Sequence, residues 1–339
     1  MRYTQAGLPR WRGFNLLGMY TTGHEGYFPE EDFQLIAELG FDFVRLPLSY
    51  RTWTVDGDLD RIEPVYQVNE KALESIDACV RAGEKYGLHI NLNLHRAPGY
   101  CINPGEKEPF NLWKDGEAVK AFAWHWELFA KRYRDIPSSR LSFDLVNEPL
   151  GLDVITREEH KRAISAAVKA IRAISPNRLV IADGMGGGNI PCPELADLNI
   201  AQSCRAYQPM TLTHHKAEWW TPSKNFTETP HWPDMMSENG LWNRQRLIDH
   251  YAEWAKMSQE LGIGVHCGEG GAYWYTPHDV VVAWMRDVMD VLQGYNIGYA
   301  LWNFRGQFGI LDSGRKDCAY EEWRGHLLDR QLYEILKAH

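Results

Sequence analysis

The stretch LSFDLVNEP, residues 141–149, changes abruptly from an alternating pattern to a polar end. Apolar and β-branched residues alternate with small or polar ones up to Val146, which is typical of a β-strand. Pro149 cannot donate a hydrogen bond to a sheet, so we expect the strand to stop there, with Glu148 at its carboxyl end. Because a buried carboxylate needs a partner, an acid at this place indicates function rather than stability.

A second stretch, GVHCGEG at residues 264–270, places Glu269 in the same way at the end of a strand pattern. For Glu148 alone, a surface glutamate that happens to follow a strand is the alternative interpretation, and the second glutamate weakens it. Two strand-end carboxylates together predict one site whose mouth is lined by two acids.

The rest of the chain alternates strand and helix patterns without a linker or a low-complexity break. Strand patterns cover residues 12–17, 43–47, 88–94, 141–146, 178–182, 201–207, 263–268 and 297–302. Helix patterns cover residues 30–39, 69–87, 116–134, 156–174, 241–262, 278–293 and 320–337, and only the connection around 191–198 looks short. Eight strands that alternate with helices predict the (β/α)8 TIM barrel of the α/β class, as a single domain over residues 1–339. The doubly wound sheet is the competing fold, but the glycine-rich segment 184–188 does not match the GxGxxG fingerprint.

Composition narrows the class of partner. The 339 residues are 44% hydrophobic and 24% charged, with a formal net charge of -9. That charge argues against nucleic acid or an anionic membrane as the main partner. The sequence holds no run of 18 apolar residues and no apolar core segment at its N-terminus, so we expect no membrane span and no signal peptide. The six cysteines are scattered, and reduced thiols of a cytoplasmic protein are the simplest interpretation; a secreted enzyme with a trimmed N-terminus is the alternative.

In a barrel the active site lies at the carboxyl ends of the strands, where polar side chains do not serve packing. Those ends hold two acids, donors to hydroxyl groups and an aromatic platform, a set that suits a sugar: Asn15, Arg45, His95, Asn147, Glu148, Tyr207, Glu269 and Trp302. The chain also has fourteen Trp, whose flat rings can stack on the apolar face of a sugar. For any single Trp, packing in the core is the alternative.

These residues occur in motifs that resemble glycoside hydrolase family 5 over essentially the whole chain. The motifs are the Asn-Glu-Pro that contains Glu148, the Gly-Glu-Gly that contains Glu269, Arg45 in VRLP, His95 in NLH and Trp302 in ALWNF. The resemblance implies a retaining glycosidase in which Glu148 is the general acid/base and Glu269 is the nucleophile.

The resemblance also implies a supporting role for other residues. Arg45 would support Glu269. Asn147 would hold the sugar 2-hydroxyl, His95 would lie beside the reacting ring, and Trp302 would form the floor of the -1 subsite. As alternatives, Arg45 could form an ordinary ion pair in the barrel core, and His95 and Trp302 could be core residues.

Glycosidic cleavage by this mechanism needs one protonated acid and one ionised nucleophile close together. Arg45 beside Glu269 would keep that carboxylate charged, and its negative charge would make Glu148 hold a proton longer. We therefore expect carboxyl groups about 5 to 5.5 Å apart, the retaining spacing, rather than about 6.5 to 9.5 Å.

The sixth strand departs from the family pattern. The family usually shows His-x-Tyr there, whereas this chain reads RAY at residues 205–207. Tyr207, which the resemblance places against the nucleophile, is kept. Either Arg205 enters the site and alters its electrostatics, or the strand is shifted by one residue and Arg205 faces a helix. His214 and His215 follow nearby, and one of them could take the role of the histidine.

The segment 208–240 is long for a connection between a strand and a helix, and such loops are usually functional or disordered. It holds Pro209, Trp219, Trp220, Pro222, Pro230, Trp232 and Pro233. Stiff turns and aromatic rings predict an ordered wall of the cleft. Trp53 and Trp113, in the second and third strand-to-helix loops, could add stacking surfaces, with loop packing as the alternative for each.

Two rival functions fit less well. A metal-dependent hydrolase would use some of the thirteen histidines, but His214 and His215 are adjacent and no HExxH spacing occurs, so we expect neither a metal nor another cofactor. A carbohydrate-binding barrel without catalysis would lack one of the two glutamates. We therefore predict a retaining endo-β-1,4-glucanase of the cellulase type that acts on β-glucan oligosaccharides or polysaccharides. Mixed-linkage β-glucan and then β-mannan are the alternative substrates.

Overall fold

The computed structural model describes residues 8–21, 28–55, 61–103, 108–237 and 239–339. Most of the N-terminal segment on which the expectation of no signal peptide rests, residues 1–7, lies outside these ranges, as does position 238 of the long loop.

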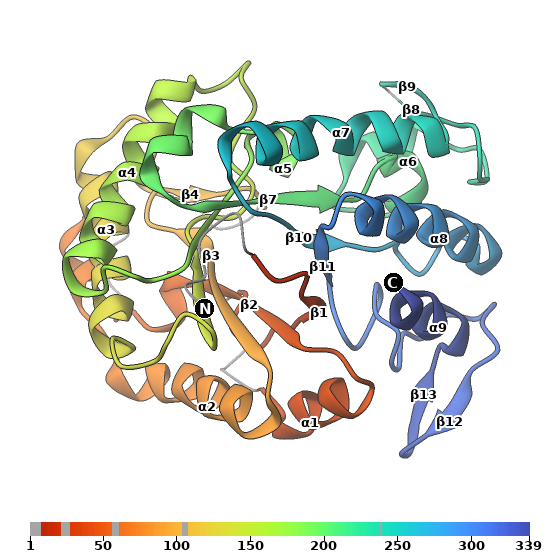
Figure 1. Ribbon diagram of the computed structural model, residues 1–339, viewed down its shortest axis with the longest axis horizontal. Helices are drawn as coiled ribbons and strands as arrows, with labels where there is room; N and C mark the ends of the chain where they lie inside the picture. Colours follow the sequence, from red (N-terminus) through yellow and green to blue (C-terminus); the bar gives the residue numbers. More distant parts are fainter. Residues whose placement is uncertain (1–7, 22–27, 56–60, 104–107, 238) are drawn as a thin grey trace.

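Eight parallel strands of the described residues close into a barrel (Figure 1). The strands follow the order β2-β1-β11-β10-β7-β6-β5-β3, and pairing between β2 and β3 closes the ring. Their bounds are β1 Arg12–Asn15, β2 Phe43–Ser49, β3 His89–Ala97, β5 Leu141–Asp144, β6 Val180–Asp183, β7 Ala201–Ala206, β10 Val265–Gly270 and β11 Gly298–Leu301. A short strand, β4 Tyr100–Cys101, folds back antiparallel on the end of β3. The predicted (β/α)8 fold is confirmed.

Helices surround the strands (Figure 1). The longer ones are α1 Glu30–Glu38, α2 Glu70–Tyr86, α3 Gly116–Arg132, α4 Arg157–Ile174, α7 Arg244–Leu261, α8 His278–Gly294 and α9 Arg330–Ala338. Their ends follow local chemistry: Thr156 and Glu159 form a reciprocal capping box at the start of α4, and Gly87 ends α2 in the left-handed conformation. In the fifth connection the short α5 Met185–Gly188 and the 3-10 turn η4 Pro193–Leu198 replace a full helix. None of the helices that the structure describes is long and apolar enough to cross a membrane.

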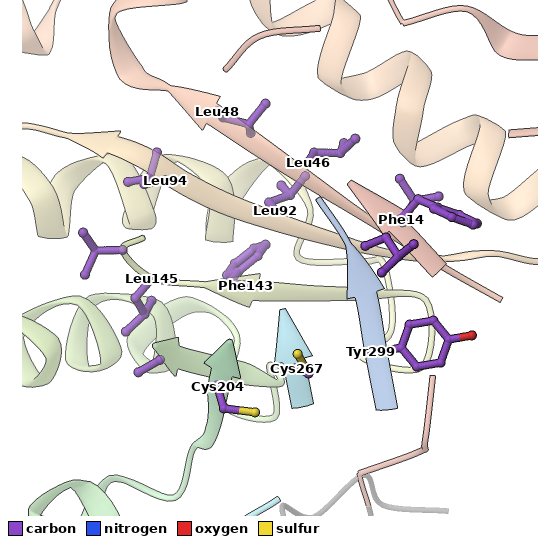
Figure 2. Packing of buried hydrophobic residues seen from close by; sticks show 14 of the residues in the cluster. Phe14, Leu46, Leu48, Leu92, Leu94, Phe143, Leu145, Cys204, Cys267 and Tyr299 are labelled. Atoms are coloured by element: carbon purple, nitrogen blue, oxygen red, sulfur yellow. The ribbon is translucent and has the colours of Figure 1, made fainter. Parts of the chain in front are cut away.

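Apolar and polar side chains alternate along the strands. The apolar ones pack between the strands and the helices, and the polar ones lie inside the barrel. In β3, Ile90, Leu92 and Leu94 belong to the buried apolar cluster. Figure 2 shows Leu92 and Leu94 beside Leu46 and Leu48 of β2 and Phe143 of β5. The residues between them are polar, and Asn91 donates a hydrogen bond to Ser142 Oγ of β5. A strand places alternate side chains on opposite faces, so one face packs under the helices and the other fills the barrel.

The C-terminal segment differs from the prediction. Residues 320–337 do not form one helix, because Glu321–Trp323 (β12) and His326–Leu328 (β13) pair as an antiparallel hairpin. Arg324 and Gly325 between them both have positive φ, as a two-residue hairpin turn requires. Only α9 is helical, and it begins where Asp329 accepts a hydrogen bond from the Leu332 N–H.

Candidate active site

A cleft of about 790 Å³ opens at the carboxyl ends of the strands. Six of the predicted site residues line it: His95, Glu148, Arg205, Tyr207, Glu269 and Trp302. Arg45 and Asn147 are 1% exposed and lie directly beneath the lining residues, in contact with them. The strand-end residues are thus brought together in one place.

Glu269, on β10, is only 3% exposed and is surrounded by donors. One carboxylate oxygen accepts from Arg45 Nη1 at 2.6 Å, and the other accepts from the Tyr207 hydroxyl at 3.1 Å. Arg205 Nη2 lies 3.4 Å from the first oxygen. Burial alone would raise the pKa of Glu269, but the guanidinium groups of Arg205 and Arg45 outweigh it and hold the pKa below its usual value. Glu269 is therefore ionised at neutral pH.

Glu148 lies beyond the end of β5, because the strand stops at Asp144 rather than at Val146 as predicted. Its backbone has a φ of 47°, a conformation that is rare for a residue with a side chain and that costs on the order of 1 kcal/mol or more. Two hydrogen bonds hold it there: the Glu148 N–H donates to Asp183 Oδ2 at 2.8 Å, and the Glu148 carbonyl oxygen accepts from the Tyr100 hydroxyl at 2.5 Å. The backbone is pinned on both sides, as strained residues at functional sites generally are.

The side chain of Glu148 faces the opening of the cleft and is 18% exposed. Burial and the negative charge of Glu269 raise the pKa of Glu148 to about 7, although Arg205 opposes them. Near neutral pH the pair therefore consists of one ionised carboxylate and one carboxyl group that can hold or release a proton.

Arg205, on β7, points into the barrel. Its Nε donates to Glu148 Oε1 at 2.9 Å, its Nη2 donates to Asn147 Oδ1 at 2.9 Å, and both terminal nitrogens donate to the Asp183 carboxylate. Arg205, and not His214, thus contacts Glu148. The His214 ring lies in the cleft wall beside Tyr207 and hydrogen-bonds Thr213.

Two glycines leave room for this arginine. A Cβ at Gly188, whose φ is +77°, would come within 2.6 Å of Arg205 Cγ, and a Cβ at Gly268 would lie 3.0 Å from Arg205 Nη1. Side chains at either place would push the guanidinium away from its partners. The glycine-rich segment 184–188 therefore serves close packing against β7.

Neighbouring side chains fix the donor and acceptor roles of Asn147 and His95. The Asn147 side-chain oxygen accepts from both Arg45 and Arg205, so its amide nitrogen is the atom left to donate to a ligand. His95 Nε2 lies 2.6 Å from Asn103 Oδ1, which can only accept, so that nitrogen carries the proton. Burial lowers the pKa of His95 to about 4, which keeps the ring neutral.

Trp302, which follows β11, lies in the cleft beside two other rings, with Tyr20 edge-on at 5.7 Å and His95 at 5.5 Å. Trp219 and Trp220 of the long loop line the same cleft. The described part of that loop contains α6 Met210–Thr213, the 3-10 turn η5 Thr221–Asn225, and a small hairpin of β8 Met235–Ser237 and β9 Gly240–Trp242. It therefore forms an ordered wall.

The other tryptophans named from the sequence do not line the cleft. Trp232 hydrogen-bonds Asp287 of α8. The stacking role suggested for Trp53 and Trp113 is wrong, because both side chains are fully buried. Trp113 packs on Tyr100, with ring centroids 4.9 Å apart, and so helps to place the hydroxyl group that holds Glu148.

Three residues of the site were missed. Asp183 ends β6, one residue beyond the predicted strand, and Asp144 ends β5 and accepts from Arg45 Nε at 2.8 Å. Both would have been found had the strand-end rule been applied with the observed ends. Tyr100 lies on the hairpin strand β4, and the sequence carries no signal that places it near Glu148.

Two groups of described residues have donor atoms spaced closely enough to hold a metal ion: His160, Cys192 and Glu194, and His278, Cys318 and Asp329. In the second group His278 Nε2 lies 2.7 Å from Asp329 Oδ2. That hydrogen bond already uses two of the three atoms that would bind the metal ion. Neither group contributes a residue to the cleft.

Comparison with known proteins identifies the family of the chain. The sequence profile of the family Cellulase (glycosyl hydrolase family 5) matches residues 6–307. Endoglucanase C of Acetivibrio thermocellus is 28% identical over 321 residues, covering 87% of this chain and 89% of that protein. Cellodextrinase A of Ruminococcus flavefaciens is 25% identical over 281 residues, covering 80% of this chain and 77% of that protein.

Solved structures show the same architecture. A crystal structure of a glycoside hydrolase superposes with a TM-score of 0.90 at 42% identity, covering 96% of this chain and 98% of that one. Endoglucanase Cel5A of Thermotoga maritima superposes with a TM-score of 0.76 at 24% identity, covering 96% of each chain, and supports the fold alone. By the profile match over most of its length, the chain belongs to glycosyl hydrolase family 5.

Proposed function

We propose that this chain is a retaining, endo-acting β-1,4-glucanase, formed by one catalytic domain, in which Glu269 is the nucleophile and Glu148 is the general acid/base. The observation that carries the proposal is the contrast between two carboxyl groups that share Arg205: Glu269 is buried against Arg45 and Tyr207, whereas Glu148 faces the opening of the cleft. Two guanidinium groups hold Glu269 ionised, while the pKa of Glu148 is raised to about 7. A double displacement needs this combination.

In the first step a Glu269 carboxylate oxygen attacks the anomeric carbon, and the bond to the leaving sugar oxygen breaks. Glu148 donates its proton to that oxygen, so the leaving group departs as an alcohol and Glu148 becomes ionised. Arg45 and Tyr207 orient the attacking carboxylate, because they hold its two oxygens. The product of this step is a covalent glycosyl-enzyme.

In the second step Glu148 acts as the base. It takes a proton from a water molecule, and the resulting oxygen attacks the anomeric carbon while the bond to Glu269 breaks. Glu148 is then protonated again, Glu269 is again ionised, and the sugar leaves with its original configuration.

The substrate class rests on the shape of the site and on the relatives. The cleft of about 790 Å³ is large enough for more than one sugar ring, and its aromatic lining by Trp302, Trp219 and Trp220 suits the apolar faces of β-linked glucose units. Relatives at 28% and 25% identity are named as an endoglucanase and a cellodextrinase. Mixed-linkage β-glucan and β-mannan are the alternative substrates, because selectivity among them depends on single hydroxyl contacts.

A product profile tests this proposal. Carboxymethylcellulose, barley β-glucan and mannan would be digested side by side, with viscosity and new reducing ends followed together. We expect the fastest cleavage on carboxymethylcellulose, with viscosity falling early relative to reducing ends, as internal cleavage requires. Faster cleavage of mixed-linkage glucan or of mannan would contradict the proposed substrate. A slow loss of viscosity relative to new reducing ends would contradict the proposed endo mode.

Replacement of Trp302 tests the proposed floor of the -1 subsite. Because the reacting sugar must be held while it is distorted, Trp302→Ala is expected to lower kcat by about 10-fold to 100-fold, and not only to raise KM. Trp219→Ala, at the partly exposed end of the wall, is the matched control and should mainly weaken binding of long substrates. If turnover by Trp302→Ala is intact, the ring serves packing and the platform lies elsewhere.

A further inference from the structure

We propose that Asp183 is the positioning residue for Glu148: it holds the acid/base through its backbone N–H, orients Arg205 against its side chain, and offsets the positive charge of that arginine. The inference deepens the proposed function and rests on Glu148 being the acid/base. Asp183 is the last residue of β6 and is fully buried.

The first observation is a closed ring of contacts. Asp183 Oδ2 accepts from the Glu148 backbone N–H at 2.8 Å, and the Asp183 carboxylate also accepts from both Nη1 and Nη2 of Arg205. Arg205 Nε donates in turn to the Glu148 side chain at 2.9 Å. One aspartate therefore holds the same glutamate at its main chain directly and at its side chain through one arginine.

The second observation is that the backbone of Glu148 needs such a hold. A φ of 47° is unfavourable for a glutamate, so the surrounding structure has to hold it. Asp183 supports the peptide from the N–H side, and Tyr100 supports it from the carbonyl side. Of these two partners only Asp183 carries a charge, so the two contributions are separable by experiment.

The third observation concerns the charges that face Glu148. They come from β6, β7 and β10, with two tyrosine hydroxyls beside them: Asp183, Arg205, Glu269, Tyr100 and Tyr207. Arg205 is a permanent cation and favours the ionised form of Glu148, whereas Asp183 and Glu269 favour the protonated form. Asp183 thus offsets the arginine that stands where the family usually has a histidine, and lets Glu148 keep a proton near neutral pH.

The test measures the alkaline limb of the pH profile of kcat/KM, which reports the acid in the free enzyme. Asp183→Asn keeps an acceptor for the Glu148 N–H but loses the negative charge, so the alkaline limb should move to lower pH by about 1 unit. Arg205→Met should move it to higher pH by about as much. The variant with both changes should return close to the parent.

Matched variants separate charge from geometry. Asp183→Glu keeps the charge in a displaced position, so kcat should fall while the alkaline limb stays in place. Tyr100→Phe removes the other hydrogen bond to the same peptide without changing any charge, and it should likewise lower kcat at an unchanged limb. An alkaline limb that stays put or rises in folded Asp183→Asn overturns the proposal, because a merely structural ion pair would alter melting temperature alone.

Two alternative measurements test the inference if a variant does not fold or if no substrate is cleaved. If Asp183→Asn does not fold, the difference in the alkaline limb between Arg205→Met and the double variant reports the Asp183 charge, because Arg45 Nη2, 3.8 Å from Asp183, still faces that carboxylate when Arg205 is absent. If no polysaccharide is cleaved, the proposed function fails, and a carbon-13 NMR titration of Glu148, assigned with Glu148→Gln, still measures its pKa in each variant. A pKa that falls in Asp183→Asn supports the inference without any substrate, and one that does not fall refutes it.

Discussion

Glu269→Gln is expected to lower kcat on β-glucan by on the order of 10⁴-fold to 10⁶-fold, the scale on which loss of a covalent nucleophile acts. An amide of the same shape can keep its oxygen toward Arg45 and donate from its nitrogen to the Tyr207 hydroxyl, which reverses that hydrogen bond, but it cannot attack the anomeric carbon. It also removes the negative charge that two guanidinium groups surround. Because the shape of the site is kept, binding of the substrate should change far less than turnover. Steady-state kinetics of the purified variant would measure the loss.

A covalent trap locates the nucleophile directly. A 2-fluoro glycoside with a good leaving group should form a glycosyl-enzyme that breaks down slowly, and peptide mass spectrometry should find the sugar on Glu269 of the unaltered protein. Proton NMR of the first-formed reducing end should show the β-anomer. Glu322→Gln, an exposed glutamate on β12, is the matched control and should retain full activity. A label on another residue, or an α-anomer, contradicts the retaining assignment.

Much of the fold follows from local pattern, because strand alternation and helix ends are determined by neighbouring residues. In β3 the apolar residues Ile90, Leu92 and Leu94 alternate with polar ones, and the barrel uses both faces as that pattern predicts. The prediction of one helix over residues 320–337 was wrong, because the charged and apolar residues of this segment also fit a helix. The turn at Arg324 and Gly325 decides for a hairpin, through a backbone conformation that periodicity does not reveal.

The site residues also fall into those that local sequence predicts and those that it does not. Residues at strand ends could be named from sequence, since the barrel rule brings those ends to one face. What stayed open or escaped prediction depends on tertiary contact. The inward direction of Arg205, one of two alternatives from the sequence, relies on space left by Gly188 and Gly268 on other elements. Tyr100, which was not predicted, reaches Glu148 only because β4 folds back along β3. The missing histidine of the family pattern was visible in the sequence, but the buried aspartate that balances its replacement was not.

Glu148 carries the second large expected effect. Replacement by Ala or Gln is expected to lower kcat/KM on cellulose-type substrates by about 10²-fold to 10⁴-fold, the usual contribution of a general acid/base. The alkaline limb near pH 7 should disappear in both variants, because the group whose pKa is raised to about 7 is gone. The acid limb should remain, since Glu269 must still be ionised.

The loss should depend on the leaving group, which distinguishes an acid/base from a residue that merely supports the fold. An aryl glycoside with an acidic phenol leaves without a proton, so Glu148→Ala should form the glycosyl-enzyme on it at a rate much closer to that of the parent. The second step then lacks its base, and the intermediate should accumulate as an initial burst. Azide needs no base and fits the space left by the side chain, so it should restore turnover and yield the β-glycosyl azide; Glu148→Gln, which keeps that space filled, should respond less. Equal losses on both kinds of substrate with no azide effect would show that Glu148 shapes the cleft without transferring a proton, and the acid/base would have to be sought among the other groups that line it.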